Sequence, residues 1–300
     1  MPYLLYCLTT LPPPLIHTFA PTLKAMNAIV LLAIGSKYEQ ILKATRSQFE
    51  AYAKRCNATL EICTQLPDPT NQGHLFTQKL LIPKKYEQYD WIAFLDLDIV
   101  ISESAPSIFE TVDTSKGFGA ILDPRGQDKF NYTNIHWFGQ RQPEKLTTRW
   151  YFKDRGIEWN EKLIGSFNAG VWLCQPKLVA DLFANYYWER TKVASGYAMH
   201  EEAPMAYLTQ THDLFFSIDE RFNQQLIYLI ADQSAYINTR VAKLQKWINK
   251  QLDKVLSKRE TPFMLQLYIQ FVDKSLKENY ILHFSGNFPI PENLSNQIKP

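Results

Sequence analysis

Two aspartates separated by one residue are the strongest chemical signal in this sequence. Asp96 and Asp98 lie in the apolar run WIAFLDLDIVI, at 91–101. On a single extended strand, both carboxylates would point to one face, with Cα atoms about 6 to 7 Å apart. Two anions in a partly apolar place repel each other, and a divalent cation relieves that repulsion. Oxygen ligands suit manganese or magnesium, whereas the alternative is an aspartate pair that caps a turn at a strand end.

The elements that must position this pair alternate between strand and helix patterns. The aliphatic run at 27–36 predicts a strand buried on both faces, ending in Gly35 and Ser36. The alternation predicts a parallel, doubly wound sheet whose ligand crevice lies beyond the carboxyl ends of its strands. Further along this half, we expect a helix at 37–55, a strand at 58–63, a helix at 74–86 and a strand at 90–101.

The second half of the chain is less regular. Residues 123–165 predict a long loop region, and loops of that length are often functional. Residues 240–258 predict a basic amphipathic helix, which either packs on the domain or lies on an anionic membrane surface. Between and after these segments, we expect a strand at 166–174, a helix from 176, a short apolar segment at 214–219 and a closing strand at 280–286.

Composition narrows the class of protein. Three hundred residues, 46% of them hydrophobic, are ample for a large core. The net charge of +2 comes from 32 basic and 30 acidic residues spread along the chain, so nothing favours nucleic acid as a partner. Four widely spaced cysteines indicate a reducing compartment. Prolines interrupt the apolar start, so we predict a cytoplasmic protein without a membrane anchor. Residues 1–26 are either an N-terminal extension or an extra strand.

The surroundings of the aspartate pair resemble the D-x-D segment of glycosyltransferases with the GT-A fold. That resemblance implies an α/β fold with a Rossmann-like mixed sheet flanked by helices. It makes Asp98 the principal metal ligand, with Asp96 on the nucleotide ribose or the metal. Further segments follow the order of glycosyltransferase families 8, 34 and 6. By resemblance, Gly35 and Ser36 bind the base and ribose, and Lys79 is a donor-binding cation; its alternative is a solvated helix lysine.

The segment SFNAGVWL is similar to the F-N-x-G-V segment of these enzymes. The similarity implies that Asn168, Ala169 and Gly170 bind the nucleotide-sugar. An asparagine offers both a donor and an acceptor to sugar hydroxyls, and a glycine permits close backbone approach. The alternative is the start of a strand that carries a bulge glycine.

The segment MHEEAPMAYL, at 199–208, resembles the H-D-E-x-x-L-N stretch of family 6 and the D-Q-x-x-L-N stretch of family 8. Ala206 departs from the usual asparagine. The match implies that Glu202 acts on the reacting face of the donor sugar, as a nucleophile or as an anionic stabiliser. Glu201 would orient the donor sugar or the acceptor. The alternative is that both acids begin a helix, whose positive end favours them.

The closing segment ILHFSGN resembles the H-F-x-G segment of families 8 and 34. The resemblance implies that His283 completes an Asp, Asp and His set around manganese, and that Gly286 lets the backbone reach the diphosphate. The alternative is a histidine with a structural role beside a strand.

These matches predict a GT-A glycosyltransferase domain at 27–290. Its nucleotide-sugar half would be 27–122 and its acceptor and catalytic half 123–290, with a helical insertion at 240–277. We expect transfer of a hexose from a UDP-sugar to a glycan or other hydroxyl acceptor, with Mn²⁺ or Mg²⁺ and, by resemblance, retention of configuration. One alternative is a nucleotide-sugar hydrolase or nucleotidyltransferase, but the sequence near Gly35 lacks the Gly-rich phosphate loop that would support it. The other alternative is a non-catalytic glycan-binding protein.

Overall fold

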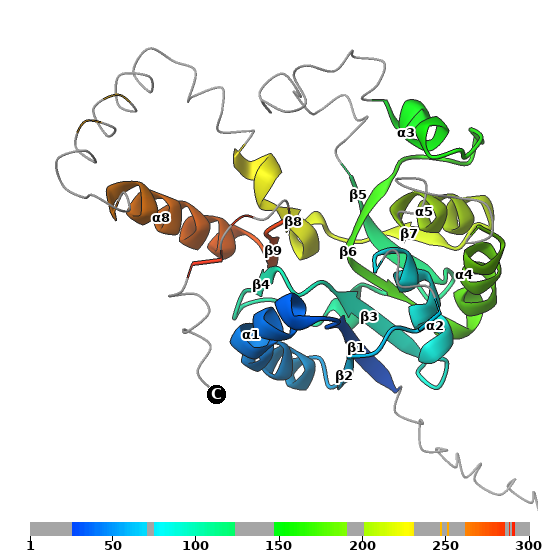
Figure 1. Cartoon of the computed structure of the whole chain (residues 1–300), viewed down its shortest axis with the longest axis horizontal. Helices are drawn as coiled ribbons and strands as arrows, with labels where there is room; N and C mark the ends of the chain where they lie inside the picture. The colour runs from blue at the N-terminus through cyan, green and yellow to red at the C-terminus, as the bar shows by residue number, and fades with distance from the viewer. Residues whose placement is uncertain are drawn as a thin grey trace, which may run out of the picture.

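A six-stranded sheet forms the centre of the molecule in the computed structural model of the chain (Figure 1). The structure describes residues 26–70, 75–123, 147–190, 201–230, 247, 251, 262–285, 288, 290 and 291. The sheet order is β2-β1-β3-β6-β5-β7. Its strands are β1 (Asn27–Leu32), β2 (Thr59–Cys63), β3 (Trp91–Leu95), β5 (Phe118–Leu122), β6 (Phe167–Cys174) and β7 (Phe215–Ser217).

The sheet is mixed, so the GT-A fold class is confirmed and the wholly parallel arrangement is wrong. β1 pairs in parallel with β2 and β3, and β5 pairs in parallel with β7. β6 runs antiparallel to both of its neighbours, β3 and β5. Between β5 and β6, the structure describes helix α3 (Thr148–Asp154), which lies beyond the end of β5 (Figure 1). Reversal of β6 brings its first residues to the edge where β3 ends.

Helices cover both faces of the sheet, as continuous burial of the central strands requires. β3 is buried at every position, and side chains alternate between two cores along β1. On one face α1 (Ser36–Arg55) packs Phe49 and Tyr52 against the sheet. On the other face lie α2 (Ile82–Lys85), α4 (Pro176–Arg190) and α5 (Glu202–Thr211) (Figure 1). The predicted helices at 37–55 and from 176 are thus confirmed.

Aromatic rings fill the core on the α4 face. The Trp172 ring stacks on Phe94, at a centroid distance of 5.1 Å, and on Phe118, at 5.6 Å. All three side chains are fully buried. Each buried side chain of this size stabilises the fold by about 1.5 to 3 kcal/mol. This packing therefore holds β3, which carries Phe94, and β6, which carries Trp172, firmly in the core.

The predicted strand at 90–101 is wrong in one respect, because it breaks between Asp96 and Asp98. The chain bends there, and the second part, β4 (Ile99–Ile101), enters a separate three-stranded sheet in the order β4-β9-β8. Gln48 of α1 fixes β4 by hydrogen bonds to the Ile99 carbonyl, at 2.9 Å, and to the Ile101 amide, at 3.0 Å. The partner strands are β8 (Gln224–Gln225) and β9 (Ile281–His283).

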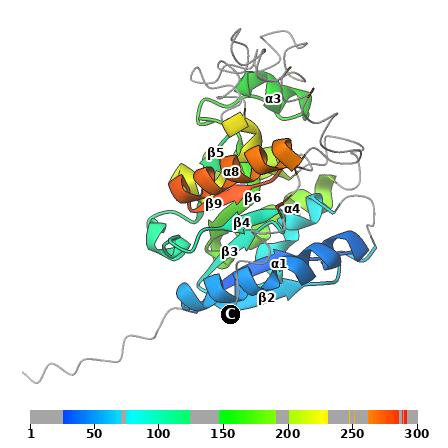
Figure 2. The ribbon, with the colours of Figure 1, turned by 90° about the vertical axis from the view of Figure 1, so that its left-hand side faces the viewer.

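Helix α8 (Pro262–Glu278) covers the small sheet, where Val272 shares a core with Leu282 and Phe284 (Figure 2). The predicted helix at 240–258 lies outside the described residues, except for 247 and 251, as do residues 1–25. Within the described part of the chain, none of the helices has the length and apolar character to cross a bilayer.

The predicted helix at 74–86 is shorter and tighter than expected. Its described part consists of a 3₁₀ turn, η1 (Thr77–Leu81), followed by α2. Pro83 lies in the first turn of α2, where it has no amide hydrogen to continue the ladder from η1. The break buries Lys79, which a regular surface helix would have exposed.

Candidate active site

One edge of the large sheet gathers the predicted site residues. Leu31 and Leu95 pair in parallel register, so the chain leaves β1 and β3 at the same edge, toward Gly35 and Asp96. Antiparallel β6 brings Gly170 to this edge, where its carbonyl accepts a hydrogen bond from the Asp96 amide at 2.8 Å. The carboxyl ends of parallel strands are the usual place for a ligand crevice.

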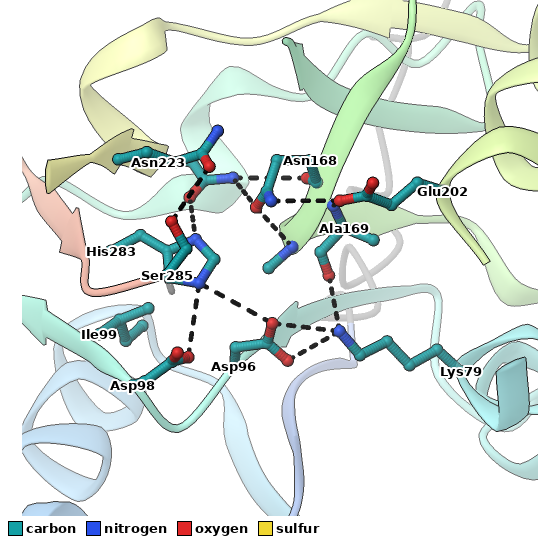
Figure 3. Close-up of polar contacts among 12 residues, drawn as sticks. Lys79, Asp96, Asp98, Ile99, Asn168, Ala169, Glu202, Asn223, His283 and Ser285 are labelled. Atoms are coloured by element: carbon teal, nitrogen blue, oxygen red, sulfur yellow. Dashed lines mark hydrogen bonds and ion pairs between the residues drawn. The ribbon is translucent and has the colours of Figure 1, made fainter. Parts of the chain in front are cut away.

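The small sheet brings His283 to the aspartates. Ile99 pairs with His283 across β4 and β9, and the Phe284 amide donates to the Asp98 carbonyl at 2.8 Å. The His283 Nε2 atom lies 3.4 Å from Asp98 Oδ1 and 4.0 Å from Asp96 Oδ2 (Figure 3). One ligand atom from each of these three residues lies within 4.8 Å of the others.

These three side chains could hold a metal ion, and two features of the structure fit that use. Two carboxylates and one imidazole are a donor set that suits manganese, which also retains positions for water and phosphate oxygens. Gly170 leaves room for the imidazole, because a Cβ atom at this position would overlap the His283 ring. The predicted proximity of Asp96, Asp98 and His283 is therefore present, although through a bend and not through strand alternation.

Lys79 is buried beside the aspartates and makes polar contacts with three residues. Its Nζ atom lies 2.9 Å from Asp96 Oδ1 and 3.1 Å from Asp96 Oδ2, and it donates to the Ala169 carbonyl at 3.2 Å (Figure 3). It also lies 3.2 Å from Glu201 Oε1. Burial lowers the pKa of Lys79, but the charges of Asp96 and Glu201 outweigh that effect and raise this pKa above its ordinary value. Lys79 is therefore a charged internal cation, which excludes the solvated helix lysine.

The carboxylates of the site differ in their electrostatics. Burial raises the pKa of Asp96 against the opposing charge of Lys79, and it raises the pKa of Glu201 in the same way. Burial would also raise the pKa of Asp98, but hydrogen bonding to His283 and its charge outweigh burial and keep that pKa below its ordinary value. Asp98 is the carboxylate that stays ionised most readily.

Glu202 lies beside the start of β6. Its Oε1 atom accepts hydrogen bonds from Asn168 Nδ2, at 3.2 Å, and from the Ala169 amide, at 3.3 Å. Its Oε2 atom accepts from the Tyr151 hydroxyl at 3.2 Å. Glu202 is also the first residue of α5, as the helix-start alternative predicts, and the three donors fix the direction of its carboxylate.

Gly35 and Ser36 lie where α1 begins. Gly35 has a φ of +85°, which an L side chain rarely adopts, and a Cβ atom built there would meet no atom within 4 Å. The open space beside the glycine leaves its backbone accessible. Tyr38, two residues into the helix, lies within electrostatic reach of the site, since burial and the charges of Asp96 and Asp98 raise its pKa. Gly286 lies outside the described residues.

Sequence patterns did not indicate three residues near the site: Tyr38, Tyr151 and Asn223. Asn223 Oδ1 lies 2.9 Å from His283 Nδ1, and its Nδ2 atom donates to Asn168 Oδ1 at 3.0 Å. Its place depends on the pairing of β8 with β9, and spacing along the chain carries no sign of that pairing. Tyr38 carried a weak signal, because it belongs to the apolar face of the predicted helix that follows Gly35 and Ser36.

The fold and site together define a class of protein. A mixed α/β sheet with helices on both faces, and paired aspartates at its ligand edge, is the GT-A architecture, and the protein is a glycosyltransferase enzyme. The model of Glycosyl transferase family 8 matches residues 13–288, and the chain belongs to this family. The likeness of this chain to families 34 and 6 remains a resemblance in the order of motifs.

Solved structures with a similar fold include other glycosyltransferases. The WbbM bifunctional glycosyltransferase is 13% identical, with a TM-score of 0.50 over 89% of this chain and 47% of its own. A glycosyltransferase involved in glycosylation of the major capsid of PBCV-1 is 11% identical, with a TM-score of 0.48 over 91% and 98%. The galactosyltransferase LgtC, solved with donor and acceptor sugar analogs, is 15% identical, with a TM-score of 0.44 over 87% of each chain. No curated protein sequence matches this chain.

Proposed function

We propose that this glycosyltransferase transfers a hexose from a UDP-sugar to a glycan or other hydroxyl acceptor, using a divalent cation and retaining the anomeric configuration. The observation that carries the proposal is the convergence of Asp96, Asp98 and His283 within 4.8 Å at the sheet edge. Retention and the UDP-sugar rest on the family resemblance. We assign 27–122 to the nucleotide-sugar half and 123–290 to the acceptor and catalytic half.

The charges of the site support the need for a cation. The site holds four carboxylates, those of Asp96, Asp98, Glu201 and Glu202, and one buried ammonium group, that of Lys79, which pairs with Asp96 and Glu201. A donor diphosphate would bring further negative charge to the same edge. Manganese or magnesium, when bound, would neutralise charge that develops on the departing diphosphate.

Lys79 acts on the donor indirectly in this proposal. An ammonium group has three hydrogens to donate. Four acceptor atoms lie around the Lys79 ammonium, namely both oxygens of Asp96, Glu201 Oε1 and the Ala169 carbonyl, so none of its hydrogens is left over for the diphosphate. We assign Lys79 to holding Asp96 and Glu201 in place, so that their remaining oxygen lone pairs face the ribose and the sugar. This assignment differs from a direct contact between the lysine and the diphosphate.

Glu202 is the proposed group on the reacting face of the donor sugar. Three donors from Asn168, Ala169 and Tyr151 fix both of its oxygens, which favours one orientation of the carboxylate. A fixed anion there would stabilise an oxocarbenium-like state or attack the anomeric carbon, and both routes are compatible with retention.

The remaining contacts complete the proposed donor site. The open backbone at Gly35 and the exposed Ser36 would receive the base and ribose. The backbone of Ala169 and Gly170 would line the sugar, with Asn168 orienting Glu202. Gly286 is assigned to the diphosphate by resemblance alone.

The test is turnover of a panel of UDP-sugars by the wild-type protein and two variants, with and without Mn²⁺. Asp98→Ala should abolish metal-dependent turnover and leave the fold intact, because the Asp98 side chain is 41% exposed. Asp181→Ala, at a surface aspartate that is 80% exposed, is the matched control and should be fully active. Undiminished turnover by Asp98→Ala would refute the ligand role.

Two further readings separate the alternatives in the same assay. Sugar release at full rate without an acceptor would identify a hydrolase, and absence of turnover with metal-dependent UDP binding would identify a binding protein. Proton NMR of the early product reports the anomer, and an inverted product would contradict retention.

A further inference from the structure

We propose that Asn223 is a positioning residue that sets the tautomer and direction of the His283 imidazole, and so makes His283 a competent metal ligand. The inference rests on the proposed metal site. Asn223 and His283 are both buried, with 4% and 3% of their surface exposed. The contact between Asn223 Oδ1 and His283 Nδ1 is 2.9 Å, which is a normal hydrogen-bond length (Figure 3).

The direction of this hydrogen bond follows from a backbone amide. Gly170 donates its N–H to Asn168 Oδ1 at 2.9 Å. A backbone N–H can only donate, so the Asn168 atom that it contacts must be the oxygen and not the amide nitrogen. Asn168 then presents its NH₂ group to Glu202 Oε1, at 3.2 Å.

The same oxygen of Asn168 fixes the second amide. Asn223 approaches Asn168 Oδ1 at 3.0 Å, and only an NH₂ group makes a hydrogen bond there. Asn223 must therefore present its oxygen to His283. The Gly170 amide thus fixes the orientation of the Asn168 side chain, and Asn168 fixes that of Asn223, so neither side-chain amide can flip.

An oxygen facing Nδ1 requires that Nδ1 carry the proton. In the neutral imidazole that binds a cation, the Nε2 lone pair then faces Asp98 Oδ1, at 3.4 Å, and Asp96 Oδ2, at 4.0 Å, as a metal ligand must. The opposite tautomer would point an N–H at the carboxylates and leave no lone pair for a cation. Metal-ligating histidines generally donate their other ring nitrogen to such a partner, and its loss weakens metal binding.

The experiment measures Mn²⁺ affinity of the metal-free protein, from the electron paramagnetic resonance signal of free Mn²⁺. Asn223→Ala removes the acceptor and should weaken Mn²⁺ binding about 10- to 100-fold. Asn223→Asp keeps an oxygen facing Nδ1 but loses the NH₂ donor to Asn168 Oδ1, so its Mn²⁺ affinity should lie between those of Asn223→Ala and wild type. The matched control is Gln210→Ala, which removes a buried amide that also donates one hydrogen bond and accepts another, both at 2.7 Å. It should leave the affinity unchanged.

Each outcome separates one idea from another. Wild-type affinity in folded Asn223→Ala overturns the inference, and so does Mn²⁺ binding by Asn223→Asp that is no tighter than that of Asn223→Ala. If Asn223→Ala does not fold, Asn223→Asp decides, because weakening by more than about 100-fold, beyond the loss expected when the acceptor is removed, overturns the inference. Absence of Mn²⁺ binding by the wild-type protein overturns the proposed metal site itself, and the inference with it.

Discussion

Replacement of Lys79 by methionine should destabilise the protein strongly, because it leaves two buried carboxylates without their cation. The Lys79 and Glu201 side chains are 5% and 6% exposed, and Asp96 is 25% exposed. Removal of one partner of a buried ion pair costs about 3 to 5 kcal/mol. Water can reach Asp96 in part, so we expect a loss near the lower end, about 3 kcal/mol of unfolding free energy at neutral pH.

The loss should shrink as the solution is acidified. Burial raises the pKa of Asp96 and Glu201 above their ordinary values of 3.8 and 4.5, and Lys79 opposes that rise. Without Lys79 both pKa values rise further. A carboxyl whose pKa is higher in the folded state favours folding when it is protonated, and this contribution is lost as the pH rises through the folded pKa. Lowering the pH from neutral toward those ordinary values should therefore narrow the gap from wild type.

The assay is urea denaturation followed by tryptophan fluorescence at several pH values. Lys84→Met is the matched control, since this exposed lysine pairs only with the surface acids Glu87 and Asp181. Its unfolding midpoint should match that of wild type. A loss below about 1 kcal/mol for Lys79→Met at neutral pH, or one that grows on acidification, would refute the internal counter-ion role.

Three other variants test separate parts of the structure. Gly170→Ala should push the His283 ring from its place, at an overpacking cost of about 1 to 3 kcal/mol, and so weaken Mn²⁺ binding about 5- to 150-fold. A wild-type Mn²⁺ affinity in calorimetric titration would contradict this. Tyr151→Phe removes one hydrogen bond to Glu202 and should lower kcat about fivefold; an unchanged kcat would show that this donor is dispensable. Gln48→Ala removes the side-chain partner of two β4 backbone groups, the Ile99 carbonyl and the Ile101 amide, and should cost about 2 kcal/mol in urea denaturation. No loss would mean that water replaces the glutamine.

Elements with a long regular pattern could be predicted from the sequence. The helix at 37–55 and the strands at 27–36, 58–63 and 166–174 correspond to α1, β1, β2 and β6. Each has a continuous apolar run or a regular apolar face that local physics interprets correctly. The direction of β6 could not be predicted this way, because the path of the chain between β5 and β6 decides it.

The break between Asp96 and Asp98 had no local signal. The residues on both sides are aliphatic, and a run of that kind is compatible with one strand or with two. Strand β4 leaves the path of β3 because it pairs with β9, which lies about 180 residues further along the chain. Only this tertiary pairing places β4 in the second sheet. The order of the motifs still predicted that Asp96, Asp98 and His283 lie close together, because this order does not depend on the geometry that connects the motifs.

Lys79 and Asn223 show the same limit at single residues. A lysine in a helical pattern ordinarily faces water, and only the 3₁₀ turn and the neighbouring acids explain its burial. Asn223 precedes a strand of two residues, too short for any periodic pattern. A sequence pattern cannot identify side chains that position other side chains, because their contacts form only when distant strands pair.

The placement of Asp98 beside β4 and of His283 on β9 has a consequence for how the protein matures. These two positions are 185 residues apart (283 − 98), so the three side chains that could hold a metal ion do not come together until β9 has docked on the first half of the chain. An ion bound there would favour the docked state in proportion to its occupancy. Chelation should then speed amide hydrogen exchange in β9 before it affects β1 or β3. Metal binding would thus stabilise the protein only at a late step of folding, after β9 has docked.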